Sequence, residues 1–279
     1  FKQKTAYEIR PRDWSSDVCS SDLKRTGTAL GWNPLIGPFG FAAVLLLVSA
    51  FIVWRFLRPD PLELNGQLDP TAQRVRPLAQ VRQSVGVIRS SDLAPLGLLA
   101  MVVAQSTMVA VMTMTPSHMR DHGQADMSAY VIALHIAGMY AFAPFVGKFV
   151  AWLGEVRSII VSGAVLALGT TVSVVAGYVT ALIFVGLFLL GLGWNFGLIA
   201  GSSLLTGAVP DSSRVEVQGT ADLTMSFCGG LAAFGSGFIK QAWGFHLLAD
   251  GAAVVAVALL LAAWVRWRLS VRVASSTAR

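Results

Sequence analysis

The stretch VTALIFVGLFLLGLGWNFGLIAGSSLL, residues 179–205, contains no charged residue in 27 positions. A helix rises about 1.5 Å per residue, so about 20 apolar residues span the roughly 30 Å of hydrocarbon in a bilayer. An open strand would leave backbone N–H and C=O groups without partners in lipid. The stretch therefore predicts a membrane-spanning helix, and it is the longest of several such runs in the chain.

Six further runs have the same character: 35–57, 95–115, 128–146, 158–176, 218–239 and 246–266. Across all seven runs the only acidic residues are Asp222 and Asp250. The whole chain is 54% hydrophobic and 13% charged, a balance typical of membrane proteins rather than soluble globular ones. The sequence predicts an all-α membrane protein with seven transmembrane helices.

Lys and Arg are distributed unevenly between the loops. If run 35–57 enters the cytoplasm, the loops and tail on that side carry thirteen basic residues, and the opposite side carries four, namely Lys24, Arg25, Arg120 and Lys240. Cytoplasmic loops of membrane proteins carry the excess of Lys and Arg. The bias predicts a multi-pass protein of the cytoplasmic membrane with a cytoplasmic C-terminus. It also assigns the net charge of +6 to topology rather than to nucleic-acid binding.

Residues 1–23 differ from the rest of the chain. They contain no apolar run of the length that a secretory signal needs, and their second half, DWSSDVCSSDL, has no apolar face to bury. FKQKTAYEI followed by DWSSDVCSSDL resembles the translation of a common sequencing adapter, with Arg10, Pro11 and Arg12 in the place of the variable index. We therefore interpret the segment as an adapter-derived artefact without a fold. Cys228 is then the lone cysteine, so neither a disulfide nor a two-cysteine metal site is expected.

Segment 58–93 is the longest stretch between two apolar runs. Pro59, Pro61 and Pro70 exclude a continuous helix through its first half. Apolar residues recur at helical spacing in its second half, at Leu78, Val81, Val85 and Ile88. This spacing predicts either a weakly amphipathic helix lying on the cytoplasmic headgroups or a solvated tether.

Polar side chains fall on four of the six runs that follow this segment. A polar group at bilayer depth is costly when it faces lipid, so these runs are expected to face a bundle interior or a wet cavity. In chain order two runs carry such polar groups and the third does not, and this order then occurs a second time. The pattern indicates an internal repeat of three helices. The candidate pathway residues on the polar runs are Gln105, Thr113, His135, Asn195, Ser202 and Asp222.

Four stretches resemble bacterial members of the major facilitator superfamily, in the order of that family: VMTMTPSHMRDHG (111–123), YVIALHIAGMYAFAPFVGK (130–148), LGLGWNFGLIAGSSLLTGAVP (190–210) and VQGTADLTMSF (217–227). The resemblance implies a two-lobe transporter in which the C-terminal lobe consists of two inverted three-helix repeats. Residues 24–57 then hold the last helix of the N-terminal lobe, 58–93 are the cytoplasmic linker between lobes, and 94–279 form the C-terminal six-helix lobe with a cytoplasmic tail. The first five helices, and with them most of the N-terminal lobe as a partner, are expected to be missing.

The resemblance also identifies GKFVAWLGEVR, 147–157, as a weak copy of the cytoplasmic signature loop of the family. Gly147 and Gly154 stand at its tight-turn positions, and Arg157 lies just beyond its last basic position. Ala151 replaces the acidic residue of the signature. We therefore expect a plain turn between bilayer helices rather than a conformational latch.

Small residues recur every four positions in two of the runs. The pattern is that of tight helix contact in membranes. The residues concerned are Gly193, Gly197 and Gly201, and then Gly229, Ala233 and Gly237. They are expected at helix-packing contacts, and the pattern leaves open whether these contacts serve rocking lobes or ordinary packing.

His135 is the one imidazole in the middle of a run. It could couple a proton to substrate movement, or it could be a neutral histidine hydrogen-bonded across helices to Gln105 or Asn195. His118 and His122 lack a third ligand nearby, so no metal site is expected.

Asp222, the one acid in a polar run, could stabilise the first turn of its helix or exchange protons with the cytoplasm. The resemblance implies a secondary active transporter of the bacterial cytoplasmic membrane that moves a small molecule through the lipid bilayer without a cofactor. Proton-coupled efflux of small amphipathic compounds is the expected activity, and uptake of a sugar or organic acid is the alternative. A seven-helix receptor is disfavoured because the last run lacks a retinal-type Lys. A membrane-embedded enzyme is disfavoured because the runs hold no nucleophile–base pair or metal cluster.

Overall fold

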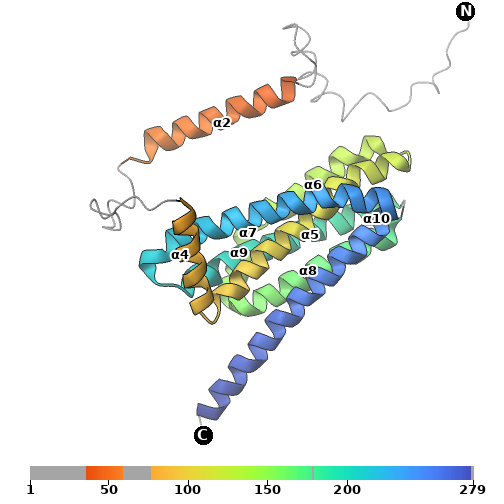
Figure 1. Ribbon diagram of the computed structural model, residues 1–279. Helices are drawn as coiled ribbons and strands as arrows, with labels where there is room; N and C mark the ends of the chain where they lie inside the picture. Colours follow the sequence, from red (N-terminus) through yellow and green to blue (C-terminus); the bar gives the residue numbers. More distant parts are fainter. Residues whose placement is uncertain (1–35, 59–76, 178, 278–279) are drawn as a thin grey trace, which may run out of the picture. The chain divides into compact units, whose positions relative to one another are not determined.

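The computed structural model describes residues 36–58, 77–177 and 179–277, and all regular elements in these ranges are helices (Figure 1). The predicted all-α class is therefore confirmed. The chain divides into two units, Phe1–Arg74 and Val75–Arg279, which are described in turn. The adapter-like segment and the first half of the expected linker lie outside the described residues.

Helix α2, Ile36–Phe56, belongs to the first unit. Its 21 residues give a length of about 30 Å. Large apolar side chains are exposed along it, with Leu46 and Leu47 at 71% and Phe56 at 74%. A helix that is apolar all round is suited to lipid rather than to water. Arg55 stands in its last turn, where a long basic side chain can reach the headgroups.

The described part of the second unit contains seven α-helices and two short 3₁₀ turns. The α-helices are α4 (Pro77–Ser90), α5 (Ala94–Asp121), α6 (Ser128–Tyr140), α7 (Ala143–Leu153), α8 (Glu155–Ala176), α9 (Thr180–Gly207) and α10 (Arg214–Thr277), and the turns are η3 (Ala125–Met127) and η4 (Asp211–Ser213). Gly244 interrupts α10, because its φ of 87° and ψ of 171° are not helical. Helix α10 therefore consists of a first arm, 214–243, and a second arm, 245–277, and Figure 1 shows the chain turning back between them.

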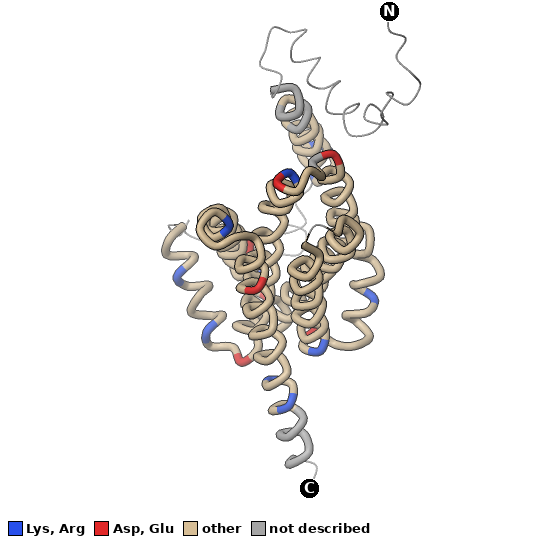
Figure 2. The backbone as a smooth tube through the Cα atoms, turned by 90° about the vertical axis from the view of Figure 1, so that its right-hand side faces the viewer, with Lys and Arg blue, Asp and Glu red and all other residues tan. Residues whose placement is uncertain are grey.

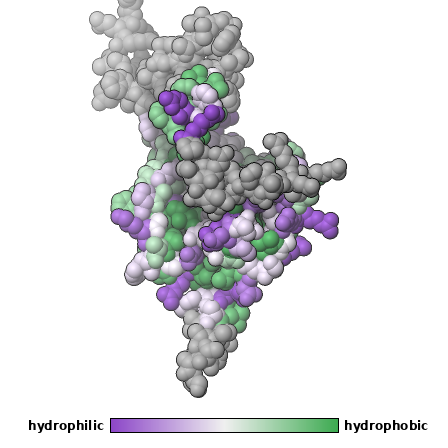
Figure 3. Space-filling view, turned by 90° about the vertical axis from the view of Figure 1, so that its left-hand side faces the viewer, coloured by the Kyte–Doolittle hydropathy of each residue, from purple (hydrophilic) through white to green (hydrophobic). Residues whose placement is uncertain are grey.

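Several of these helices have the dimensions of membrane spans. Helices α5, α8, α9 and α10 are each long and apolar enough to cross a bilayer, and α6 and α7 together form another such segment. Charged residues gather toward the helix ends, and the middle stretches carry few of them (Figure 2). Apolar side chains reach the surface between hydrophilic ones (Figure 3), and Phe227 and Phe234 of α10 are 65% and 70% exposed. Apolar surface of this extent belongs in lipid, so the described chain has the features of a multi-pass membrane protein.

The prediction of one helix over 128–146 is wrong. Helix α6 ends at Tyr140, and after two residues α7 begins at an angle of 41° to it. Pro144 lies in the first turn of α7. Proline has no N–H to bond to the preceding turn, and it disfavours the helical conformation of the residue before it. The break therefore follows from a residue that a count of apolar side chains does not weigh.

The second half of the expected linker is a packed helix. In α4, Ile88 is only 3% exposed and lies in an apolar cluster with Met101 of α5 and Leu205 of α9. Leu78, at the other end of the helix, is 86% exposed. The alternative of a solvated tether is therefore wrong for the residues of α4, because its C-terminal half is anchored by burial. Its contact with the headgroups stays a prediction.

Helix α9 packs closely against its neighbours through glycines. A Cβ added at Gly193, Gly197 or Gly201 would come within 2.6–2.9 Å of atoms of α5 or α8. Gly229 of α10 has an equally close neighbour, whereas Gly237 has no atom within 4 Å of such a Cβ, so the close packing expected there is absent. The period of four missed other glycines with equally close contacts, namely Gly97, Gly138, Gly163, Gly169, Gly186 and Gly191.

Candidate functional site

One set of polar side chains is buried between α6 and α9. His135 is fully buried, and its Nδ1 lies 2.7 Å from the backbone oxygen of Leu187. Asn195 is 2% exposed, and its Nδ2 donates to the backbone oxygen of Gly138 at 3.4 Å. The predicted hydrogen bond of His135 across helices is therefore present, but its partner is the backbone of α9 rather than the side chain of Gln105 or Asn195. We call His135 and Asn195 the buried clamp.

Glycines make the buried clamp possible. A Cβ at Gly191 would collide with the backbone oxygen of His135, and a Cβ at Gly138 would lie 2.7 Å from the backbone oxygen of Phe188. With no side chains at these points, each helix approaches until a polar side chain of one reaches a carbonyl of the other. The clamp fixes the distance between two helices, and it offers no accessible surface to a solute.

A second set of polar side chains runs along the first arm of α10. We call Gln218, Asp222, Ser236 and Lys240 the polar stripe, and their separations of four, fourteen and four residues place them on one side of the helix. At one end, Ser202 of α9 donates to Gln218 Oε1 at 2.9 Å, and Gln218 Nε2 donates to Asp222 Oδ1 at 2.9 Å. Asp222 is exposed, so this end of the polar stripe is accessible.

The other end of the polar stripe bonds to α5. The hydroxyls of Ser236 and Thr113 lie 3.3 Å apart. Lys240 Nζ donates to Ser117 Oγ and to Asp121 Oδ2, both at 2.6 Å. These contacts tie the C-terminal half of α5 to the first arm of α10, close to the turn at Gly244.

Gln105 of α5 lies against both α9 and α10. Its Oε1 accepts a hydrogen bond from Trp194 Nε1 at 2.7 Å, and the ring of Tyr140 stands edge-on to Trp194 with 5.7 Å between centroids. A Cβ added at Gly229 would lie 2.9 Å from Gln105, so α10 packs directly on this amide. Trp194 was not among the predicted site residues, although an indole N–H needs an acceptor when it is buried, and this was the available signal.

The prediction that Asp222 stabilises the first turn of its helix is wrong. Helix α10 begins at Arg214, so Asp222 lies in the third turn, and the acid in the first turn is Glu216. The unpaired N–H groups of a helix start are confined to its first four residues. The carboxylate of Asp222 is held by Gln218 instead.

The expected signature loop contains one turn glycine rather than two. Gly147 lies inside α7, whereas Gly154 has a φ of 87° and separates α7 from α8. Arg157, in the first turn of α8, places its guanidinium 5.5 Å from the ring centroid of Trp267 on the second arm of α10. This cation–π contact joins the two helices beside the turn.

The histidines near the end of α5 pack with one another and with the backbone. His118 Nε2 lies 2.8 Å from the backbone oxygen of Gly177, and its ring is 4.4 Å from those of His122 and Phe245. Within the described ranges, no group of three or more His, Cys, Asp or Glu residues is placed to hold a metal ion.

Comparison with known proteins identifies the family. The model of the Major Facilitator Superfamily matches residues 26–233. Two uncharacterized MFS-type transporters of Bacillus subtilis (strain 168), YddS and YdeG, are each 32% identical, over 83% and 86% of this chain and 54% and 56% of their own. The riboflavin transporter RfnT of Brucella anthropi is 28% identical over 76% of this chain and 51% of its own. No solved structure matches.

The chain spans about half the length of the curated relatives it matches. The matched residues include α2, all helices from α4 to α9, and most of the first arm of α10. The buried clamp falls within them, as do Gln218 and Asp222 of the polar stripe, whereas Ser236 and Lys240 lie beyond the matched range. This chain therefore belongs to the Major Facilitator Superfamily, a family of transporters and not of enzymes.

Proposed function

We propose that this chain is the C-terminal portion of a secondary active transporter that moves a small molecule across the bacterial cytoplasmic membrane by alternating access. Membership of the family supports transport. Coverage of only about half of each relative supports a further lobe of the same polypeptide as partner. On this proposal α2 is the last helix of the N-terminal lobe, 58–93 connect the lobes, and the C-terminus is cytoplasmic.

The second unit is proposed to contain two inverted three-helix repeats. One repeat is α5, the bent pair α6 and α7, and α8, and the other is α9 and the two arms of α10. The first helices of the two repeats meet at Gly97 and Gly201, where an added Cβ on either glycine would press on the backbone oxygen of the other. The contact is reciprocal, as expected where a pseudo-two-fold axis passes between equivalent helices, so this pair supports the arrangement of six spans.

The polar stripe is the observation that carries the proposal of proton-coupled transport. Asp222 is an exposed acid in a helix that is otherwise apolar enough to cross the membrane. Ionisable residues within membrane-spanning helices face a water-filled path or a partner. We propose that Asp222, held by Gln218, exchanges protons with the cytoplasm during transport.

The proposed substrate is a small amphipathic compound that leaves the cell in exchange for protons. One relative is named a riboflavin transporter, which supports a small organic substrate. The alternative is uptake of a sugar or organic acid. An organic anion would need a cation, and Lys240, the one cation of the polar stripe, is already paired with Asp121.

Transport by the full-length protein under an imposed pH gradient tests this function. We expect flux to rise with the gradient in the parent, and Asp222→Asn to give a flat curve while substrate still binds, because the amide cannot carry the proton. Asp250→Asn, which changes the exposed acid of the second arm, is the matched control and should follow the parent. Parallel curves for the parent and Asp222→Asn would overturn the coupling role, and absence of saturable flux in the full-length parent would overturn transport itself.

A further inference from the structure

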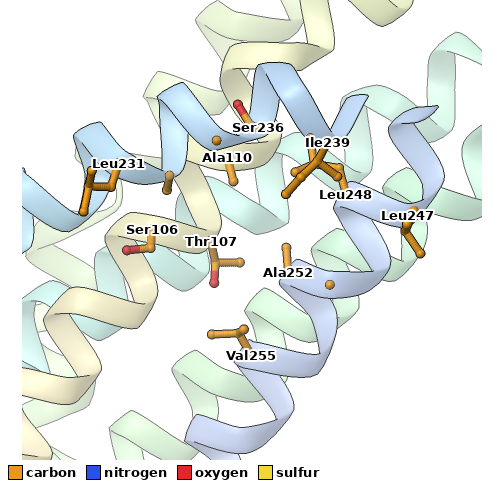
Figure 4. A pocket seen from close by; sticks show the side chains of 13 residues that line it. Ser106, Thr107, Ala110, Leu231, Ser236, Ile239, Leu247, Leu248, Ala252 and Val255 are labelled. Atoms are coloured by element: carbon orange, nitrogen blue, oxygen red, sulfur yellow. The ribbon is translucent and has the colours of Figure 1, made fainter. Parts of the chain in front are cut away.

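A cavity of about 410 Å³ lies between α5 and the two arms of α10 (Figure 4). Its walls include Leu231 and Ile239 of the first arm and Leu248 and Val255 of the second. Small residues such as Gly251 leave the space open. Sites for small molecules in proteins have volumes of about 300–1,000 Å³ and mostly apolar walls with a few polar groups. None of the residues that line this cavity is ionisable, so it is not built for a charged molecule.

One buried hydroxyl in the cavity lining has no partner among the described residues. Thr107 is 3% exposed, and its hydroxyl makes no hydrogen bond to any described residue. Thr113 and Thr115 of the same helix donate to backbone oxygens four residues earlier. Figure 4 shows Thr107 turned into the cavity, toward Ala252 and Val255. A buried hydroxyl without a partner destabilises the fold, so a polar group of a bound molecule would stabilise this position.

The cavity opens to the surface, where Leu231, Leu247 and Val255 of its lining are 44–55% exposed, and water does not suit its apolar walls. An ordered water needs two to four polar partners. The polar lining consists of three hydroxyls, those of Ser106, Thr107 and Ser236, and Ser236 already bonds to the backbone oxygen of Ala233 and to Thr113. A lipid acyl chain would fill the apolar part of the space, but it carries no group for Thr107.

We propose that this cavity binds a small uncharged molecule with an apolar body and one hydroxyl or carbonyl group, which bonds to Thr107. The apolar body lies against the two arms of α10, so the bound molecule connects both arms to α5 beside the turn at Gly244. This site goes beyond the proposed transport function. Its test measures binding and not flux, so its failure would leave that function standing.

Binding of 4-phenylphenol to the full chain in lipid nanodiscs, measured by equilibrium dialysis, tests the site, with 4-methylbiphenyl as a probe of the same shape that lacks the hydroxyl. We expect saturable binding of one 4-phenylphenol per chain. Thr107→Val keeps the shape of the side chain and removes its hydroxyl. It should weaken 4-phenylphenol binding about tenfold, the effect of one lost hydrogen bond, and leave 4-methylbiphenyl binding unchanged.

Filling the cavity should abolish binding of both probes. Gly251→Leu serves this purpose, because no atom lies within 4 Å of an added Cβ there. Gly235, also in the lining and equally open, offers a second filling variant, Gly235→Leu, if the first does not fold. Gly230→Leu is the matched control, since Gly230 is open and exposed but does not line the cavity. It should bind as the parent does.

Three results would overturn the proposal. The first is absence of saturable 4-phenylphenol binding, or equal binding by the parent and the folded filling variants. The second is an equal loss of both probes in Thr107→Val, because the hydroxyl would then play no part. The third is a phospholipid that native mass spectrometry finds on the parent and not on Gly251→Leu, because an acyl chain would then be the occupant.

Discussion

The buried clamp and the polar stripe both join helices by hydrogen bonds, yet they differ in the groups they use. In the clamp, His135 and Asn195 bond to backbone oxygens and are inaccessible. In the stripe, Gln218 and Asp222 bond to each other through their side chains, and Asp222 is exposed. A backbone oxygen in a helix stays in place. Two bonded side chains can instead separate, and each can then bond to water or to a solute. The clamp is therefore suited to holding α6 against α9, and the stripe to changing partners during transport.

The close contacts made at glycines differ between the clamp and the stripe in the same way. At Gly191 the added Cβ meets the backbone of α6, which cannot move without moving the helix. At Gly229 it meets the side chain of Gln105, which can turn away. The clamp side of the second unit therefore tolerates less change than the stripe side. Four variants test this difference, in order of their expected effect on stability.

The largest loss of stability is expected for Gly191→Ala. The added Cβ collides with the backbone oxygen of His135, so α6 and α9 must separate. Such overpacking lowers the free energy of unfolding by about 1–3 kcal/mol. Gly207→Ala is the matched control, because Gly207 ends the same helix with open space around it, and its change should stay within about 0.5 kcal/mol. Unfolding of the purified chain in detergent measures both, and equal stability of the two variants would contradict the close approach.

A smaller loss is expected for His135→Leu. The variant removes one hydrogen bond to Leu187, with a net contribution of about 1 kcal/mol. His135 Nε2 has no partner among the described residues, so its removal costs nothing further. In the full-length protein, flux at matched expression should keep its dependence on the pH gradient. A flat dependence together with unchanged stability would instead assign His135 to proton coupling.

The salt bridge between Lys240 and Asp121, at the end of the polar stripe near Gly244, should contribute less to stability. Lys240 is 15% exposed and Asp121 is 56% exposed, so water and salt screen the pair. We expect Lys240→Met to lower the unfolding temperature by less than about 2 °C at low salt, with the difference shrinking in molar NaCl. Asp250→Asn serves as the control for a charge change outside the stripe. A loss that persists unchanged at high salt would show that packing of Lys240, and not its charge, joins the helices.

The positions of the membrane helices were largely predictable, and their interruptions and packing were less so. Apart from 128–146, every apolar run after residue 94 lies on one helix or one arm of α10 to within a residue, because hydrophobic length alone sets that pattern. Pro144 was a readable signal for the break between α6 and α7. The burial of Ile88 was not predictable, because it depends on side chains of α5 and α9 that are distant in sequence.

In the candidate site, too, the residues were more predictable than their contacts. The sequence identified the polar residues Gln105, Ser202 and Asp222, but not their partners, since periodicity does not tell which helices face each other. The start of α10 was placed too late because hydropathy locates the membrane part of a helix, whereas the helix itself begins among the polar residues at Arg214. The close contact at Gly191 was not predictable, because its close neighbour is the backbone of another helix.

The smallest effect on stability, with a distinct effect on transport, is expected for Gln218→Leu. Leucine is close to glutamine in size, but it can neither accept from Ser202 nor donate to Asp222. Both partners are accessible enough to bond to water instead, so the free energy of unfolding should change by no more than about 0.5 kcal/mol. The carboxylate of Asp222 then loses the donor that fixes its position. Flux through the full-length protein should therefore depend differently on the pH gradient, whereas Gln241→Leu, the same change at an exposed position of the same arm, should leave that dependence as in the parent. A stability loss as large as that of His135→Leu, combined with an unchanged gradient dependence, would mean that the polar stripe holds the helices in the same way as the buried clamp.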